Sequence, residues 1–213
     1  MGSEFLTSPF DNLLKPVDDH LIVHNELMSS LILGNKIQIH TSKHGLPDLD
    51  TTRIVIIGIP ENRNSIDYLG DELNLNEIRK SLYNLYPGNW STEIADLGNL
   101  ILGENVEQTY GRIISMLSIL FEKNIIPIII GGSHDLLYAN YRAYDSFKST
   151  VNIVNIDSNF DIGDSAKPIN NLSYLGKIIL DEPHNLFNYS NLGYQTYHNS
   201  QEEICLLYTS PSP

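Results

Sequence analysis

The chain has 213 residues, a formal net charge of -13 at pH 7 and a hydrophobic content of 41%. This length and apolar content predict a globular protein with a substantial core. The negative charge argues against binding to nucleic acid or to an anionic membrane, because both attract cationic surfaces. No apolar run approaches the ~18–20 residues of a membrane-spanning helix, and residues 1–5 lack the features of a secretory signal, so we expect a cytoplasmic protein.

Alternating apolar patterns predict an α/β fold. In chain order, the predicted elements are a helix around residues 21–33, a strand over 53–60, a helix over 75–85, a strand over 92–97, a helix over 106–121, a strand over 125–130, a helix over 136–144, a strand over 151–157, a helix over 175–180 and a strand within 191–197. Strands that alternate with helices predict a mostly parallel sheet covered on both faces. We expect a single domain over residues 1–204.

The last nine residues, 205–213, continue no pattern of the preceding chain. They resemble a translated transposase sequencing adaptor, and we interpret them as a non-native tail, with the native gene cut off near Ile204. A natural disordered tail is the alternative. Because Cys205 is the only cysteine, a foreign tail would leave the native part without disulfides or thiol catalysis.

Two predicted strands each end in potential metal ligands. The strand over 125–130 leads into Gly131-Gly132-Ser133-His134-Asp135, and the strand over 151–157 leads into Asp157-Ser158-Asn159-Phe160-Asp161. In an open parallel sheet, residues just past the carboxyl ends of the strands line the ligand crevice. We therefore expect His134, Asp157 and Asp161 at one rim, where imidazole and carboxylate donors suit manganese or zinc. A metal bound there would activate a water for hydrolysis.

A simpler interpretation gives the same residues structural roles. Aspartate and asparagine are ordinary loop residues, so Asp157 and Asp161 could cap the turn that follows the strand. His134 would then be a hydrogen-bonded histidine at the start of a helix. Spacing alone leaves both interpretations open.

The two segments together resemble the ureohydrolases, the family of arginase, agmatinase and formimidoylglutamase. Residues 131–135 are similar to that family's Gly-Gly-x-His-x motif, and residues 157–161 to its Asp-Ala-His-x-Asp motif. Residues 131–145 are most similar to a formimidoylglutamase-like branch from Bacteroidetes-type bacteria. The resemblance covers residues 5–204 and implies an arginase-like, three-layer α/β/α fold that is incomplete at its C-terminus. Supporting similarities are Gly58-Ile59-Pro60, Asn76-Glu77-Ile78-Arg79 and Asp96-Leu97-Gly98-Asn99.

The resemblance also implies a cofactor and residue roles. Family members use two manganese ions to activate a water that attacks a guanidinium or formimino carbon and releases urea or formamide. By this resemblance His134 binds the first metal, Asp157 bridges both metals and Asp161 binds the first, so that both aspartates are also catalytic candidates. The family's histidine on the second metal falls at Asn159, whose carbonyl oxygen is a weaker donor. Two further aspartate ligands would lie beyond Ile204, so we expect the fragment itself to be inactive.

Other motifs carry weaker signals. Ser133-His134-Asp135 names the residues of a catalytic triad, but adjacent residues rarely converge, and Asp135 replaces the second glycine of a nucleophile elbow. Gly131-Gly132 could cradle an anion at a helix start, although the nucleotide-binding fingerprints are missing. His20 and His24, four residues apart, could hold a metal or simply face solvent. Tyrosines at helical spacing favour core or subunit packing over substrate stacking: Tyr138, Tyr141 and Tyr144.

Three functional hypotheses follow. The first is a metal-dependent hydrolase of a small linear amidine, with formiminoglutamate as the preferred substrate, that forms a homo-oligomer when complete. The second is a non-catalytic homologue with one metal or none, kept for binding or assembly, and the third is a nucleotide-binding domain without metal. We also expect the chain that ends at Pro213 to be poorly stable, because it would expose a sheet edge and an apolar face.

Overall fold

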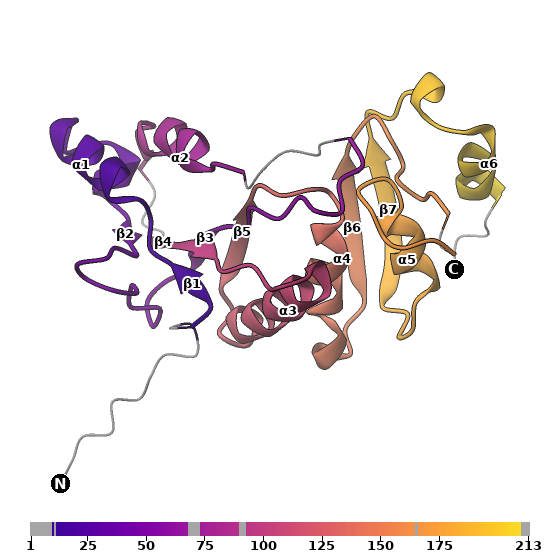
Figure 1. Cartoon of the computed structure of the whole chain (residues 1–213), viewed down its shortest axis with the longest axis horizontal. Helices are drawn as coiled ribbons and strands as arrows, with labels where there is room; N and C mark the ends of the chain where they lie inside the picture. Colours follow the sequence, from indigo (N-terminus) through magenta and orange to yellow (C-terminus); the bar gives the residue numbers. More distant parts are fainter. Residues whose placement is uncertain (1–9, 11, 68–72, 90–92, 165, 210–213) are drawn as a thin grey trace, which may run out of the picture. The chain divides into compact units, whose positions relative to one another are not determined.

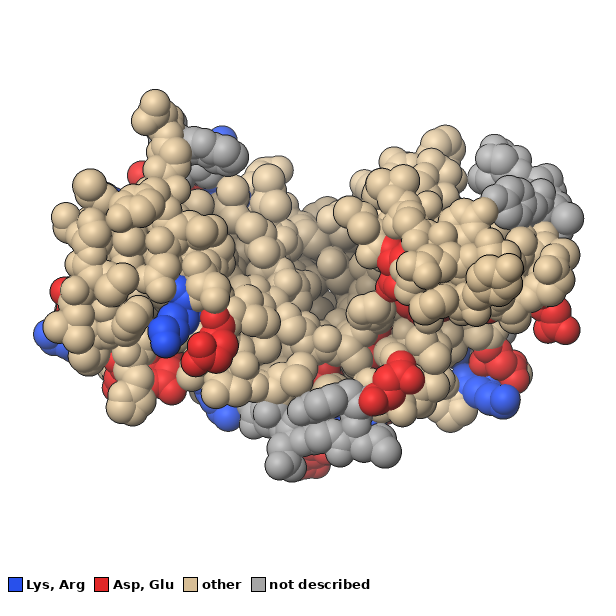
Figure 2. Space-filling view, turned by 90° about the horizontal axis from the view of Figure 1, so that it is seen from above, with Lys and Arg blue, Asp and Glu red and all other residues tan. Residues whose placement is uncertain are grey.

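The computed structural model describes residues 10, 12–67, 73–89, 93–164 and 166–209. The chain divides into two compact units, of which the first comprises residues 1–61 and 71–132 and the second residues 62–70 and 133–213. No helix among the described residues is long and apolar enough to cross a membrane. Figure 2 shows acidic side chains at several places on one face, in keeping with the net charge of -13.

Among the described residues, the first unit forms a five-stranded, mostly parallel sheet with three helices (Figure 1). Its strands are ordered β1-β4-β3-β5, and β2 also pairs with β4. All pairings are parallel except that of β1 with β4. The elements are β1 (Leu14–Lys15), α1 (Asp19–Leu27), a 3-10 turn η1 (Leu33–Asn35), β2 (Gln38–Ile39), β3 (Ile54–Gly58), α2 (Asn76–Tyr83), β4 (Ile94–Leu100), α3 (Val106–Glu122) and β5 (Ile126–Ile130).

The core of this unit is built on β3, the central strand between β4 and β5. Val55, Ile56 and Ile57 are almost fully buried because both neighbouring strands and the side chains around them cover the strand. The helix α3 packs beside β5 and buries the apolar face that its periodicity predicts. Five residues of that predicted face are all buried: Val106, Ile113, Met116, Leu117 and Leu120.

A buried ion pair joins α2 to β4. The guanidinium of Arg79 donates to both carboxylate oxygens of Asp96, at 2.9 and 3.1 Å, and to Asn99 Oδ1 at 2.6 Å. Tyr83 donates its hydroxyl proton to Asp96 Oδ2 at 2.8 Å, and the backbone N–H of Gly98 donates to Asp96 Oδ1 at 2.8 Å. The side chains of Arg79 and Asp96 are both 0% exposed. Each charge is therefore paired and hydrogen-bonded, as burial requires.

The described part of the second unit contains a two-stranded parallel sheet and three helices (Figure 1). Residues of β6, α4 and α5 share one apolar core, which includes Tyr141, Ile153, Phe160, Tyr174 and Ile178. Side chains 151, 153 and 155 of β6 face this core, since side chains alternate along a strand. The elements are α4 (Leu136–Arg142), 3-10 turn η2 (Asp145–Phe147), β6 (Val151–Ile156), α5 (Tyr174–Leu180), β7 (Leu186–Leu192), 3-10 turn η3 (Thr196–His198) and α6 (Gln201–Thr209).

The helix α6, which no apolar period predicts, begins with a capping box. The Glu203 carboxylate accepts from the backbone N–H and the hydroxyl of Ser200, at 3.0 and 2.9 Å, while the Glu203 N–H donates back to Ser200 Oγ. This reciprocal pair satisfies donors that a helix start otherwise leaves unpaired. Residues 205–209 of the expected foreign tail lie in this helix, and residues 210–213 lie outside the described part of the chain.

The mixed α/β architecture and the mostly parallel pairing are confirmed, whereas several predicted boundaries are wrong. The predicted helix at 21–33 is only Asp19–Leu27, because Met28 is already extended. The last strand is Leu186–Leu192 instead of a segment within 191–197, since Gly193 adopts a positive φ of 93° directly after it. Residue 92 of the predicted strand 92–97 lies outside the described residues, and β4 runs to Leu100.

Two predicted burial patterns are also wrong. The helical spacing of Leu75, Ile78, Leu82 and Leu85 predicts an apolar face that turns inward. Instead, α2 buries Arg79 and Tyr83 through the ion pair with Asp96, and Ile78 and Leu85 are 49% and 57% exposed. The strands β5 and β6 were expected to be buried on both faces. Instead, alternate side chains of each strand are exposed to solvent in the described structure. These side chains are Ile126, Ile128, Val154 and Ile156.

Candidate metal centre

Three of the predicted ligands come together in the second unit. His134 lies just before α4, Asp157 directly follows β6, and Asp161 lies four residues further along the same loop. One potential ligand atom from each residue lies within 4.8 Å of the others, and this is the only group of three or more His, Cys, Asp or Glu residues with such spacing among the described residues. The backbone therefore brings a histidine and two carboxylates to one point, as the strand ends predict.

The geometry centres on the Nδ1 atom of His134. This atom lies 3.2 Å from Asp157 Oδ2 and 3.3 Å from Asp161 Oδ2. The His134 side chain is 59% exposed, whereas the carboxylates of Asp157 and Asp161 are 14% and 1% exposed. The centre is thus anchored in the protein by its carboxylates and open to solvent at its imidazole.

The local backbone is shaped so that Asp161 turns inward. Asp161 adopts a left-handed φ of 56°, which aspartate tolerates better than most side chains. Its backbone carbonyl accepts from the N–H of Leu175 in α5 at 3.1 Å. Gly176, one residue further on, approaches the loop so closely that an added Cβ would lie 2.2 Å from the carbonyl oxygen of Ile162. The start of α5 therefore fixes the loop that carries Asp161.

The charges at the centre change the ionisation of its neighbours. The pKa of His134 is raised, above all by its hydrogen bond with Asp161; burial opposes this shift, and the charges of Asp157, Asp161 and Asp135 add to it. Burial raises the pKa of Tyr174, and the negative charge of Asp161 adds to that effect. Burial likewise raises the pKa of Tyr189. Both phenols therefore stay protonated near neutral pH and remain hydrogen-bond donors.

The donor set fits a divalent cation. Two carboxylates and one imidazole are the oxygen and nitrogen donors that manganese and zinc accept. Among the described side chains, the half-exposed imidazole of His134 is the basic group that the structure places against the two carboxylates. A metal at this point would bind the same atoms that now face one another. His134, Asp157 and Asp161 would be the residues that hold it.

Asn159 differs from these three residues. Its side-chain oxygen accepts from the Ser158 hydroxyl at 3.0 Å, and its backbone N–H donates to Asp157 Oδ1 at 3.1 Å. Its backbone carbonyl accepts from Asn191 at 2.8 Å. Asn159 therefore helps to shape the loop around Asp157, while its own potential ligand oxygen is engaged by a neighbour.

The other sequence motifs are placed apart from this chemistry. The Ser133 hydroxyl hydrogen-bonds to Asp135 rather than to His134, which does not produce a serine–histidine pair. The backbone N–H of His20 donates to Asp18, and neither His20 nor His24 joins a group of three potential ligands among the described residues. Tyr141 is 2% exposed and belongs to the core of the second unit, in agreement with a packing role.

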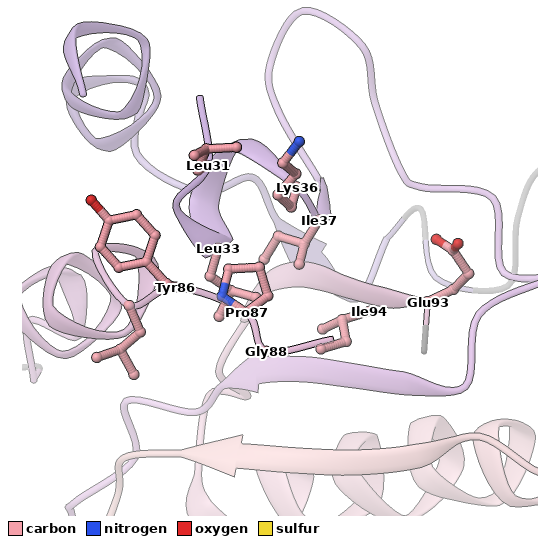
Figure 3. Close-up of a pocket in the computed structure, with 10 residues that line it drawn as sticks. Leu31, Leu33, Lys36, Ile37, Tyr86, Pro87, Gly88, Glu93 and Ile94 are labelled. Atoms are coloured by element: carbon pink, nitrogen blue, oxygen red, sulfur yellow. The ribbon is translucent and has the colours of Figure 1, made fainter. Parts of the chain in front are cut away.

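A cavity in the first unit is lined by none of the predicted site residues. Its volume is about 680 Å³, and most of its lining is apolar (Figure 3). Lys36 and Glu93 contribute its two charged side chains, and Tyr86 lies at its rim. The cavity offers apolar surface without a converging set of catalytic groups.

The polar side chains that adjoin the metal candidates could not be recognised from sequence motifs. Asn155 donates to the hydroxyls of Tyr174 and Tyr189, at 3.4 and 3.5 Å, and Asn191 donates to the Tyr189 hydroxyl at 3.2 Å. The only available signal was the polar Asn155 at an inward position of an otherwise apolar strand face. Tyr174 and Tyr189 carry no motif that would have marked them.

Comparison with known sequences gives a family and a group of relatives. Residues 52–207 match the Arginase family. Formimidoylglutamase from Lysinibacillus sphaericus is 27% identical over 133 residues, which are 60% of this chain and 40% of that protein. Formimidoylglutamase from Macrococcus caseolyticus is 30% identical over 114 residues, which are 51% of this chain and 35% of that protein. The matches thus span about two fifths of the length of these relatives.

Solved structures share the fold. Trypanosoma cruzi formiminoglutamase, crystallised with manganese, superposes on this chain with a TM-score of 0.67 at 18% identity. The superposition covers 76% of this chain and 59% of that chain. Formimidoylglutamase from Bacillus subtilis gives a TM-score of 0.67 at 18% identity, with 83% of this chain and 57% of that chain covered. At these identities the likeness establishes a common architecture.

Proposed function

This chain belongs to the arginase family, and we propose that its second unit carries a manganese site of a hydrolase that acts on a linear amidine. The observation that carries the proposal is the convergence of His134, Asp157 and Asp161 within 4.8 Å. The family-level resemblance inferred from the motifs is confirmed. The bacterial branch and the foreign origin of residues 205–213 stay predictions.

The proposed substrate is a formimino compound such as formiminoglutamate. The relatives with the matching sequences are formimidoylglutamases, which supports this choice over guanidino substrates. A formimino group is a cationic amidinium when protonated, and two carboxylates attract such a cation. The exposed side of the centre, at His134, gives a small molecule access from solvent.

The three residues have distinct parts in this proposal. When bound, manganese lowers the pKa of a coordinated water so that attack on the amidine carbon is possible near neutral pH. Asp161, the most buried of the three, fixes the position of the site in the protein. Asp157, which is partly exposed and directly follows β6, presents its carboxylate on the solvent side of Asp161. His134 must release its proton before it can bind metal, and its raised pKa makes binding stronger at higher pH.

The test is substrate selection by the manganese-loaded protein in its complete form, since the 213-residue chain itself is expected to be inactive. Formiminoglutamate, arginine and agmatine are offered separately, and formamide and urea are measured. We expect formamide release alone, lost in Asp157→Asn and in chelator. Urea release would assign the site to guanidino substrates, whereas metal binding without any turnover would overturn the catalytic proposal.

A second candidate function is a non-catalytic homologue that binds one metal. The orientation of Asn159 favours it, because the amide oxygen accepts from Ser158 and a second metal would lose its family ligand. Manganese titration of the complete protein separates the two candidates. Two bound ions would support the hydrolase, and one ion or none would support the non-catalytic homologue.

A further inference from the structure

The strand β6 continues its buried face directly into the metal candidates. Ile153 is 8% exposed and packs in the core, and Asn155 is the next inward residue. Asp157 follows at the same two-residue interval. The register pairs Ile153 with Tyr189 and Asn155 with Asn191 on the neighbouring strand. A polar layer therefore separates the apolar core from the carboxylate end of the strand.

Tyr174 links this polar layer to His134. Its ring meets the imidazole of His134 edge to face, with centroids 6.4 Å apart and an interplanar angle of 88°. Its hydroxyl oxygen accepts from Asn155 Nδ2 at 3.4 Å, which leaves the hydroxyl proton available for donation. Tyr174 is 2% exposed, so the surrounding core restricts its movement.

One carboxylate oxygen of Asp161 lacks a hydrogen-bond donor among the described residues. Its Oδ2 faces the imidazole, whereas its Oδ1 is buried and has no hydrogen-bond partner among the described residues. A buried carboxylate oxygen without a partner is costly. The backbone holds Tyr174 close to this loop, because the N–H of the next residue, Leu175, donates to the Asp161 carbonyl at 3.1 Å.

We propose that Tyr174 is a positioning residue of the metal centre. Its ring orients the His134 imidazole, and its hydroxyl, held by Asn155, donates to Asp161 Oδ1 so that Oδ2 is directed at the metal. This inference rests on the proposed metal site and adds the group that aligns it. Partners of metal ligands that fix their orientation are commonly worth 10–100-fold in metal affinity.

The test compares Tyr174→Phe with Tyr141→Phe. Both tyrosines are 2% exposed in the same core, and each loses one accepted hydrogen bond, from Asn155 and from the backbone N–H of Asn185 respectively. Manganese affinity is measured by electron paramagnetic resonance on the full chain, together with the line shape of the bound ion. We expect Tyr174→Phe to weaken binding about tenfold or more and to alter the line shape. Tyr141→Phe should leave both unchanged.

The outcomes separate this inference from the proposed function. Wild-type protein that binds no manganese overturns both. Wild-type binding with equal affinities in the two phenylalanine variants overturns the positioning role alone. If Tyr174→Phe does not fold, Asn155→Ala keeps the tyrosine and removes the group that holds its hydroxyl. A smaller loss of manganese affinity in that variant supports the proposal, and an unchanged affinity contradicts it.

Discussion

The two units of the molecule each bury carboxylates, but they neutralise them differently. In the first unit, Asp96 receives two hydrogen bonds from Arg79 and others from Tyr83 and Gly98. In the second unit, Asp157 and Asp161 share one imidazole that is 59% exposed, and one oxygen of Asp161 has no partner among the described residues. The first cluster is complete within the protein, whereas the second pairs two carboxylates with one half-exposed imidazole, which fits the proposed metal site.

This difference distinguishes buried charges that stabilise the fold from buried charges that can bind a ligand. A buried charge that has every partner tends to hold the fold together, and removal of one partner is expensive. A buried charge that lacks partners lowers stability until a ligand arrives, which is typical of functional sites. Whether a buried polar group has all its hydrogen-bond and charge partners therefore indicates whether its role is structural or functional.

The largest expected effect is on the complete cluster. Arg79→Met leaves Asp96 buried without its cation and should lower the free energy of unfolding by about 3–5 kcal/mol. Urea denaturation followed by circular dichroism measures this loss. Lys80→Met, at an exposed position of the same helix, is the matched control and should change stability by less than about 0.5 kcal/mol. Similar effects of the two substitutions would remove the contrast between the clusters.

The incomplete cluster should respond to metal instead. Manganese at about 100 times its dissociation constant should raise the free energy of unfolding by about 2.7 kcal/mol, because it binds only the folded protein. Asp157→Asn should abolish this increment, and its effect on the metal-free protein should be much smaller than that of Arg79→Met. Thermal melts with manganese or with chelator measure both quantities. Equal stabilisation of the wild type and of Asp157→Asn would show that the metal binds elsewhere.

The close contact between α5 and the Asp161 loop gives a third test. Gly176→Ala would place a Cβ 2.2 Å from the Ile162 carbonyl oxygen, so we expect a cost of about 1–3 kcal/mol and weaker manganese binding. Gly111→Ala in α3 is the matched control, because its Cβ would meet no atom within 4 Å. That substitution should stabilise the protein by about 0.5–1 kcal/mol. A neutral Gly176→Ala variant would mean that α5 does not hold the loop.

The smallest expected effect concerns the capping box of α6. Burial alone would raise the pKa of Glu203, but hydrogen bonds from Ser200 and Gly163 lower it on balance. A lowered folded pKa contributes stability that is present above the unfolded pKa of about 4.3 and is lost as the pH falls through the folded value. Glu203→Gln should therefore cost about 0.3–1 kcal/mol at pH 7 and progressively less in acid. Stability curves of both proteins between pH 7 and pH 3 measure the difference, and a cost that grows in acid would contradict the assignment.

Local patterns predicted the elements that apolar periodicity defines. β3, β5, β6 and α3 lie within about two residues of their predicted bounds, because branched apolar runs and one amphipathic face encode them directly. β1 and β2 were missed, since two-residue strands carry no period. Ser200 and Glu203 have the spacing of a capping box in the sequence, and this spacing predicts the start of α6.

Contacts between distant segments were beyond local patterns. Arg79 is fully buried only because Asp96, 17 residues away, pairs with it. The convergence of His134 with Asp157 and Asp161 was predictable, because both segments follow strands of a parallel fold. The support from Tyr174 was not, because it depends on where the start of α5 meets the loop. The candidate ligands were therefore predictable from the sequence, whereas the side chains that surround them were not.

A manganese titration of the full chain, followed by electron paramagnetic resonance and repeated with Asp161→Asn, tests directly whether the cluster binds metal. We expect one tightly bound ion per chain, because three ligands of one site converge while Asn159 is engaged by Ser158. The substitution should abolish that binding while the fold remains intact. A wild-type chain that binds no manganese, or a variant that binds it equally well, would contradict the claim that this cluster is a metal centre.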